Sequence, residues 1–373
     1  MTVSSTTLAQ KLIQFPSLNP PGAEKACIEY LAGLLSDGGL TVATFEFAPN
    51  RPSLIAKIAG SESDEPLCFT GHVDVVPLGA EIWTTAPFAG SIRNGKLFGR
   101  GASDMKAGVA AFVVATLAQV ENRTKFRRGV TLVITAGEET GCQGAFHLAQ
   151  LGVLGSSALL IVAEPSSNSP IIAHKGSLRL SISARGRTAH SSMPELGDNA
   201  ICKIVEWIRS LNAFQFNVPA HSLLGKTTAS VTTIFGGQNI NSVPDFAGFT
   251  VDFRTIPAHR HSDLLDDVEK LLGTEARIEV VTDFKGFATQ PNDRAIEPLI
   301  DILSKRSGKR PTLTGAPYFT DASALVPGFN NVATVVIGPG EAAQCHQTDE
   351  FCYVDHIEEA FHIYSALIQK MCT

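Results

Sequence analysis

The feature that most constrains the fold of this chain is a series of short, β-rich apolar runs in its first half. Each run is bounded by Gly, Pro or acidic residues, as buried strands usually are. The runs occupy residues 53–58, 67–76, 130–135 and 159–163. Residues 102–120 form a stretch too long and too rich in alanine for a strand, and we expect a helix there. This alternation predicts an α/β domain with a mixed, largely parallel sheet flanked by helices.

The order of the expected elements changes after residue 175. Residues 176–286 contain, in order, a strand, a helix, two strands, a helix and a strand, which predicts a four-stranded sheet with two helices on one face. Strand and helix alternate again from residue 287 onward. A single core usually stops growing at about 250 to 300 residues. We therefore predict a discontinuous main domain, residues 1–175 and 287–373, and an inserted α+β domain, residues 176–286.

Composition limits the partners of the chain. The formal net charge is -6, and no stripe of Lys and Arg is interleaved with aromatic residues, so we expect no nucleic-acid partner. No segment reaches about 18 uninterrupted apolar residues and no secretory signal is visible, so we expect a cytoplasmic protein with no membrane partner. The seven scattered cysteines indicate reduced thiols. Cys345 adjoins a histidine and could be a ligand or nucleophile, but we favour ordinary packing.

Side chains of the types that bind metals follow directly after several of the expected strands. The segments FTGHVDVVP, LVITAGEET and LLIVAEP each join an apolar run to a histidine or an acid. In open α/β sheets, ligands gather beyond the carboxyl ends of the strands. GRGASDMKAG adds an acid near the start of the expected long helix, and GPGEAAQCHQTDE adds a histidine beyond the last core strand. The candidate ligands are His72, Asp104, Glu139, Glu164 and His346.

These residue types predict a pair of metal ions. Two metals about 3.5 to 4 Å apart need a bridging carboxylate, further ligands on each side and a shared water. Histidine together with carboxylate suits zinc, and also cobalt or manganese. Asp74 lies two residues beyond His72 and so points the same way on a strand, where its carboxylate can orient the His72 ring. Glu138 and Glu139 are adjacent and face different ways, so one can bind metal while the other acts as a general base.

Taken singly, a histidine or a pair of glutamates is usually a surface or packing feature. Their joint occurrence after buried strands favours a site, and the surrounding sequence supports this. Five blocks occur in order: GHVDVVP, WTTAPFAGSIRNGKLFGRGASDMKAG, GEETGCQGA, AEPS and GPGEAAQCHQTDE. Over essentially the whole chain they resemble the zinc aminoacylase/carboxypeptidase family, which includes acetylornithine deacetylase, succinyl-diaminopimelate desuccinylase and the glutamate carboxypeptidases.

The resemblance implies a role for each metal-site residue. One ion would be bound by His72 and Glu164 and the other by Glu139 and His346, with Asp104 bridging, Glu138 as general base and Asp74 beneath His72. The resemblance also implies a cis peptide bond between Asp104 and Met105. The inserted domain resembles the lid and dimerisation domain of the family, so a homodimer is expected. In GRTAHSSMPELGDNA, His190 would reach into the partner's site and stabilise the oxyanion.

Substrate contacts are implied at four further positions. Asn241 in NSVPD and Arg254 in VDFRTIP match an asparagine near the substrate and an arginine that pairs with an α-carboxylate. Thr320, in the loop YFTDAS that also contains Asp321, would line the acyl pocket. Lys175 would stand where desuccinylases usually have arginine, and its segment AHKGSL resembles the acetylornithine deacetylase branch more closely.

The expected activity is therefore hydrolysis of the amide bond of an N-acyl amino acid. A water that bridges two divalent ions would attack the amide, with Glu138 as base. The donors favour zinc as the metal. Acetylornithine deacetylase is the preferred type. The alternatives are a succinyl-diaminopimelate desuccinylase, a metal-dependent dipeptidase or carboxypeptidase acting on peptides, and an inactive metal-binding scaffold. An inactive scaffold would not need a general base beside its metal ligands. The presence of Glu138 as an acid that binds no metal therefore argues against the scaffold.

Overall fold

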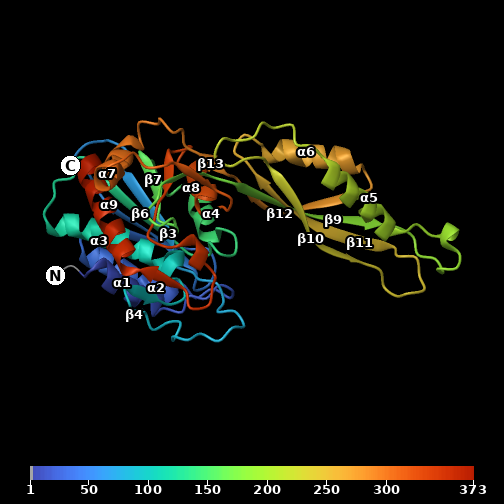
Figure 1. Ribbon diagram of the computed structural model, residues 1–373, viewed down its shortest axis with the longest axis horizontal. Coiled ribbons are helices and arrows are strands. Elements are labelled where there is room, and N and C mark those ends of the chain that lie inside the picture. The colour runs from blue at the N-terminus through green and yellow to red at the C-terminus, as the bar shows by residue number, and fades with distance from the viewer. Residues whose placement is uncertain (1–2) are drawn as a thin grey trace. The chain divides into compact units, whose positions relative to one another are not determined.

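In the computed structural model, which describes residues 3–373, the chain forms two compact units (Figure 1). The first unit comprises the chain up to Ala173 together with Ala288–Thr314 and Thr320–Thr373, and the second comprises His174–Phe287 and Gly315–Phe319. Gly315–Phe319 lies outside the expected inserted domain. It joins the second unit because the main-chain N–H of Lys175 donates to the carbonyl of Ala316 at 3.0 Å, a contact between residues far apart in the chain.

The first unit is built on a mixed sheet. Its strands follow the order β1 (Thr41–Glu46), β2 (Pro52–Ile58), β6 (Val130–Thr135), β3 (Leu67–His72), β7 (Leu159–Val162), β15 (Thr334–Val336), β8 (Ile171–His174) and β13 (Phe287–Ala288), and β14 (Thr314–Ala316) pairs with β8. The central strands β6, β3, β7 and β15 are parallel to one another, whereas β1 and β2 are antiparallel to their neighbours. The expected fold class is confirmed.

Burial explains why the central strands are apolar throughout. Every residue of β3, β6 and β7 is buried, which is typical of parallel strands covered on both faces. In the register between β3 and β6, His72 lies opposite Thr135, so the two strands end side by side. The loops that follow these strands therefore begin at the same edge of the sheet.

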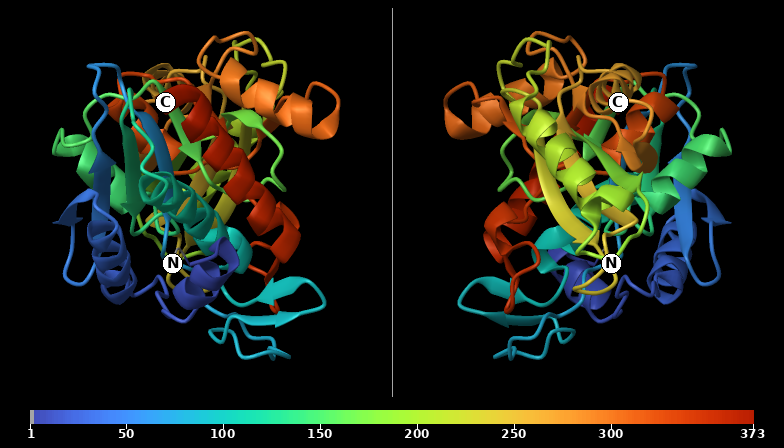
Figure 2. Two further views of the ribbon diagram at one scale, coloured as in Figure 1. Left: turned by 90° about the vertical axis from the view of Figure 1, so that its left-hand side faces the viewer. Right: turned by 90° about the vertical axis from the view of Figure 1, so that its right-hand side faces the viewer.

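Helices cover both faces of this sheet. They are α1 (Ser5–Ile13), α2 (Lys25–Asp37), α3 (Ala107–Glu121), α4 (Gln143–Gln150), α7 (Glu297–Ser307), α8 (Ala322–Gly328) and α9 (Val354–Cys372). Figure 1 shows α3 and α9 on one side of the sheet and α4 and α8 on the other. Figure 2 shows α9, in red, running beside α3, in teal, across the first of these faces. Within residues 3–373, no helix has both the length and the apolar character needed to cross a membrane.

The expected long helix begins later than the sequence suggests. Ala102–Lys106 forms a short wide turn in which Asp104 and Met105 have non-helical backbone angles, and the regular helix α3 begins at Ala107. The peptide bond between Asp104 and Met105 is cis, as expected. A small sheet of β4 (Ser91–Arg93), β5 (Lys96–Phe98) and β16 (Phe351–Tyr353) completes the first unit. Short helical turns occur at Ala342–Gln344 in this unit and at Pro194–Leu196 in the second.

The second unit has the expected element order. Its antiparallel sheet runs β10 (Thr228–Gly236), β11 (Phe246–Thr255), β9 (Gly176–Arg185) and β12 (Arg277–Phe284), with helices α5 (Ala200–Ala213) and α6 (His261–Leu272). Alternate residues of β9 and β11, among them Leu180 and Phe249, pack with Ile204 and Val268 of the two helices. Both helices consequently lie on one face of the sheet (Figure 1).

Candidate metal centre

The carboxylate of Asp104 joins two groups of potential metal ligands. Its Oδ1 lies 3.2 Å from His72 Nε2, and its Oδ2 lies 3.4 Å from His346 Nε2. In each group, one ligand atom from every member lies within 4.8 Å of the others. The groups are His72, Asp104 and Glu164, and Asp104, Glu139 and His346. A carboxylate shared in this way occupies the position of a bridge between two ions.

The sheet brings these side chains together from distant parts of the first unit. His72 is the last residue of β3, and Glu164 follows two residues after the end of β7. Glu139 lies in the loop after β6, and Asp104 lies in the turn before α3. His346 follows β15 in a loop and has a φ of 65°, in the left-handed region that non-glycine residues seldom adopt. The geometry thus places all five candidate ligands at one edge.

Acidic groups outnumber the imidazoles at this edge. Burial raises the pKa of Glu138 and Glu164 well above the ordinary value, and neighbouring carboxylates raise both further. Asp104 and Glu139 raise the pKa of the His346 imidazole to about 10. Burial alone would raise the pKa of Asp104. The hydrogen bonds from His346 and His72 outweigh burial and hold that pKa below its ordinary range. These shifts all favour the uptake of positive charge, so the centre suits cations.

One atom of the centre specifically requires a further partner. Glu139 Oε1 is buried and has no hydrogen-bond partner among the described residues, while its other oxygen lies 3.2 Å from His346 Nε2. A buried carboxylate oxygen without a partner is costly unless a cation or donor meets it. The mixed imidazole and carboxylate donors are those that zinc and related divalent ions take. The residues present therefore fit a pair of divalent metals.

Asp74 contacts the site differently from the expected arrangement. The His72 Nδ1 atom lies 2.9 Å from the main-chain oxygen of Asp74 but 3.5 Å from its carboxylate Oδ1. Because β3 ends at His72, the strand alternation that would align the two side chains does not extend to residue 74. The Asp74 carboxylate instead accepts from the main-chain N–H groups of Gly137, Glu138 and Glu139. The carbonyl orients His72, and the carboxylate fixes the loop after β6.

Glu138 stands beside the two ligand groups without belonging to either. It is buried, and its main-chain N–H donates to Asp74 Oδ1 at 3.2 Å. Its neighbour Glu139 lies 3.2 Å from His346 Nε2, whereas Glu138 Oε1 lies 3.8 Å from Cys142 Sγ, so the two adjacent acids contact different groups. An acid with a raised pKa at a metal edge, outside the ligand set, has the properties of a general base.

Two supporting residues were missed by the sequence analysis. Glu350 is fully buried and accepts from the main-chain N–H groups of Ser103 and Asp104, at 2.8 and 3.0 Å. Asn19 donates from Nδ2 to Asp74 Oδ2 at 2.8 Å. The only signal for Glu350 was its place at the end of GPGEAAQCHQTDE, and Asn19 had none, because each acts through contacts remote in the chain.

The expected substrate residue Thr320 lies two residues before α8 in the first unit. Its side chain is buried, and its hydroxyl accepts from the main-chain N–H of Ala322 at 3.1 Å, at the beginning of α8. The hydroxyl is thus engaged with the main chain beside Asp321. Its expected role at the acyl pocket stays a prediction.

The remaining expected contacts lie in the second unit. The Lys175 ammonium donates to the main-chain oxygen of Lys226 at 2.7 Å, and burial lowers its pKa. The Arg254 guanidinium lies 3.1 Å from Asp252 Oδ2. His190 and Asn241 are exposed on neighbouring loops, where the Asn241 carbonyl accepts from the N–H of Ser191. Both side chains are thus accessible, whereas Lys175 is already engaged within its own unit.

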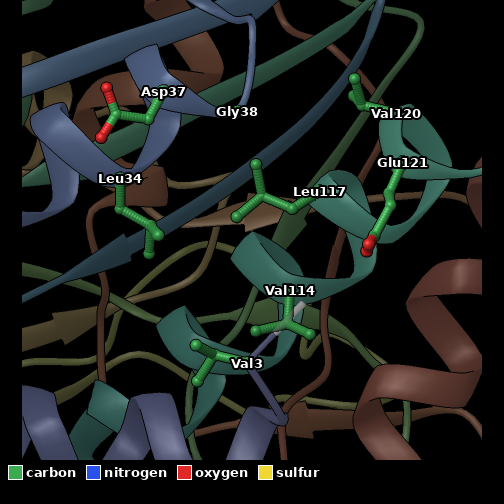
Figure 3. Close-up of a pocket in the computed structure, with 8 residues that line it drawn as sticks. All are labelled: Val3, Leu34, Asp37, Gly38, Val114, Leu117, Val120 and Glu121. Atoms are coloured by element: carbon green, nitrogen blue, oxygen red, sulfur yellow. The ribbon is translucent and has the colours of Figure 1, made fainter. Parts of the chain in front are cut away.

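A cavity of about 510 Å³ lies elsewhere in the first unit, between α2 and α3 (Figure 3). Its lining is mostly aliphatic, with Leu34, Val114 and Leu117 pointing toward the space. None of the eight residues labelled in the figure is a candidate metal ligand or Glu138. The chemistry of the protein therefore belongs to the acidic edge of the sheet and not to this cavity.

Comparison with known proteins identifies the family. Residues 68–370 match the group described as peptidase family M20/M25/M40. The chain belongs to this family. A probable succinyl-diaminopimelate desuccinylase from Staphylococcus epidermidis is 30% identical over 378 residues, 92% of this chain and 93% of the relative. The succinyl-diaminopimelate desuccinylase of Wolbachia pipientis is 27% identical and covers 99% of this chain and 94% of its own length.

Solved structures of M20 peptidases share the fold. Aminopeptidase PepT from Bacillus cereus superposes with a TM-score of 0.78 at 21% identity, covering 99% of both chains. An M20 family metallo-carboxypeptidase from Sulfolobus solfataricus gives a TM-score of 0.81 at 17% identity, covering 98% of this chain and 99% of its own. A dinuclear metal-binding M20 peptidase from Bacillus subtilis gives 0.71 at 15% identity, with 98% and 97% covered.

As an M20 family member, the protein is a metal-dependent amide hydrolase. The expected closer resemblance to acetylornithine deacetylase is not confirmed, since the relatives named above are desuccinylases. That preference depended on three short segments, AHKGSL, TDAS and GPGEAAQCHQTDE. Identity across more than nine-tenths of the chain outweighs it.

Proposed function

We propose that this M20 protein hydrolyses the amide bond of an N-acyl amino acid with two divalent ions. The observation that carries the proposal is the Asp104 carboxylate, whose two oxygens face His72 and His346 separately. His72 and Glu164 would hold one ion, Glu139 and His346 the other, and Asp104 both. When bound, the ions would supply Lewis acidity for a water and for the amide carbonyl.

Glu138 would move the proton in this reaction. Its carboxylate is buried beside the ligands and does not belong to either ligand group. Because burial raises its pKa, it can hold a proton taken from water and return it to the departing amine. Asp74 would keep Glu138 in place by binding the main chain of residues 137–139. This arrangement supports an enzyme rather than an inactive scaffold.

The second unit would act as lid and dimerisation domain. Its strand β10 lies at the edge of the sheet and exposes Ile234 and Phe235. Exposed edge strands with apolar side chains readily pair with another chain. In such a homodimer, the exposed His190 would complete the partner's site and stabilise the oxyanion. Asn241, on the adjacent loop, and Arg254 would contact the amino-acid part of the substrate.

Two acyl groups have specific support. The desuccinylase relatives favour a succinyl group, whose terminal carboxylate needs a cation. The contact of Lys175 with the Lys226 carbonyl favours a small neutral group such as acetyl, because that ammonium is already engaged. A dipeptide substrate, as acted on by peptidases of the family, is the third possibility.

A substrate panel with zinc, cobalt and manganese tests the proposal. N-acetylornithine, N-succinyl-diaminopimelate and several dipeptides would be compared by kcat/KM at equal metal occupancy. A clear preference for one acylated amino acid is the expected result. A preference for dipeptides would assign the protein to the peptidases, and no hydrolysis of any of these amides by fully metal-loaded protein would reject the proposed function.

A further inference from the structure

Three buried side chains link the end of β6 to the helices α4 and α8 behind Glu138. Thr135 is the last residue of β6, Cys142 precedes α4 and Asp321 precedes α8. All three are at most 2% exposed. None of them is a metal-ligand candidate, and the proposed reaction assigns no role to any of them.

Two hydrogen bonds involve these side chains, and one of them ends on the proposed base. The Cys142 Sγ atom lies 3.8 Å from Glu138 Oε1 and donates its proton to that oxygen. The Thr135 hydroxyl donates to Asp321 Oδ2. The other carboxylate oxygen, Asp321 Oδ1, is buried without a hydrogen-bond partner among the described residues. A buried carboxylate oxygen without a hydrogen-bond partner lowers the stability of the fold, so a functional role for Asp321 would explain why it is there.

The thiol lies between two carboxylates that compete for it. Burial raises the pKa of Asp321 to about 6, while the hydrogen bond from Thr135 and the nearby Cys142 thiol act in the opposite direction. A thiol has a single proton to donate. Since Thr135 already supplies Asp321 with a donor, the Cys142 proton is available to Glu138. Without the Thr135 hydroxyl, Asp321 would draw the thiol proton toward itself.

The backbone at Cys142 shows that the side chain, rather than the local conformation, favours this residue. Cys142 has a φ of 54° and a ψ of 31°, the left-handed region in which a Cβ atom is unfavourable. Glycine would be less strained there. A glycine, however, would have no donor for Glu138.

We propose that Cys142 is a positioning residue for Glu138, and that Asp321 and Thr135 direct its thiol proton onto the Glu138 carboxylate. The inference builds on the proposed function, which makes Glu138 the base. Held by the thiol, Glu138 Oε1 cannot turn away to become a further metal ligand, so the carboxylate stays poised to receive a proton from water.

The test compares kcat, KM and metal content in matched variants of the metal-loaded enzyme. Cys142→Ala and Thr135→Val should each lower kcat about tenfold, the scale of one hydrogen bond to a charged group, with KM within about twofold. Cys142→Ser and Thr135→Ser keep a donor and should recover most of the lost activity. Both metals should remain bound in every variant. Cys372→Ala is the control, because its buried thiol contacts the carbonyl of Gly129, before the opposite end of β6.

A double variant tests the proposed order of the contacts. Because Thr135 acts through Cys142, Thr135→Val combined with Cys142→Ala should be no slower than Cys142→Ala alone. The inference is overturned by a Cys142→Ala enzyme with unchanged kcat, by kcat losses that multiply in the double variant, or by loss of metal that accounts for the loss of rate. Failure of the proposed function is distinct, because the wild-type enzyme would then be inactive on N-acyl amino acids.

Discussion

Glu350 holds the main chain of Asp104 in place: its Oε1 accepts the Asp104 N–H at 3.0 Å, although 246 residues separate the two in sequence. The same carboxylate binds the N–H of Ser103 and Gly101 and the buried guanidinium of Arg100. The bridging position of the metal centre therefore depends on a residue that touches no proposed ligand side chain.

Replacing this carboxylate should destabilise both the fold and the metal centre. In Glu350→Gln, Arg100 loses its partner in a buried pair and an amide nitrogen faces main-chain donors. The free energy of unfolding should fall by about 3 to 5 kcal/mol, as when one member of a buried pair is removed. Denaturant unfolding of the metal-free protein measures this. Glu297→Gln, which breaks the exposed pair with Arg310, is the control and should change stability little.

The sharing of Asp104 predicts unequal metal loss. Asp104→Ala should lose both ions, because only Asp104 belongs to both ligand groups. His346→Ala should retain the ion at His72 and Glu164 more firmly than the ion at Glu139. Metal content per chain after gel filtration, with zinc supplied beforehand, measures the difference. A chelator should abolish hydrolysis in the unaltered protein. Equal metal loss in the two variants would argue against a bridging role.

Glu138 should be needed for the reaction and not for the metals. Glu138→Gln is expected to keep both ions and the fold while kcat falls by about 10²- to 10⁴-fold, the usual range for a general base. Steady-state kinetics at known metal content provide the measurement. If the substitution releases metal instead, the roles of Glu138 and Glu139 have been exchanged.

A mixture of two inactive chains tests whether His190 acts in the partner's site. Glu138→Ala and His190→Ala chains would be purified separately and allowed to exchange subunits. In a mixed dimer, the chain carrying His190→Ala keeps its own Glu138 and receives an intact His190 from its partner. With random pairing about a quarter of the unaltered activity should return. No recovery after demonstrated exchange would show that His190 does not serve a partner.

His174 should make the second unit less stable in acid. Its imidazole is buried, Nε2 has no partner among the described residues, and burial lowers its pKa to about 4. The unfolded chain binds this proton near pH 6.5, so the stabilisation is fully present above that pH and is lost progressively as the pH falls toward 4. The loss should be on the order of 3 kcal/mol.

Urea unfolding followed by Trp207, which packs against the core of the second unit, measures this loss. A Trp83→Phe background removes the other tryptophan, and chelator removes metal. His174→Gln should lose less stability than the parent between pH 7.5 and 5, whereas the exposed His190→Gln should follow the parent. Equal pH dependence of all three proteins would contradict the assignment to His174.

The sequence determined the fold class and the ligand candidates because both depend on local pattern. Apolar runs of strand length predicted β3, β6 and β7, and parallel pairing places the ends of such strands at one edge. His72, at the end of β3, and Glu164, just after β7, could therefore be selected without a structure. The start of α3 was misplaced because composition alone extends the alanine-rich helical stretch back through Asp104 and Met105.

The tertiary structure alone decided how these side chains are supported. Glu350 reaches Asp104, and Thr135 reaches Asp321, across 246 and 186 residues. The carbonyl of Asp74 lies closer to His72 Nδ1 than its carboxylate does, because β3 ends at His72. Hydrogen bonds have short range and strict direction, so they follow from the packed positions of distant segments, whereas strand and helix patterns follow from residues near in sequence.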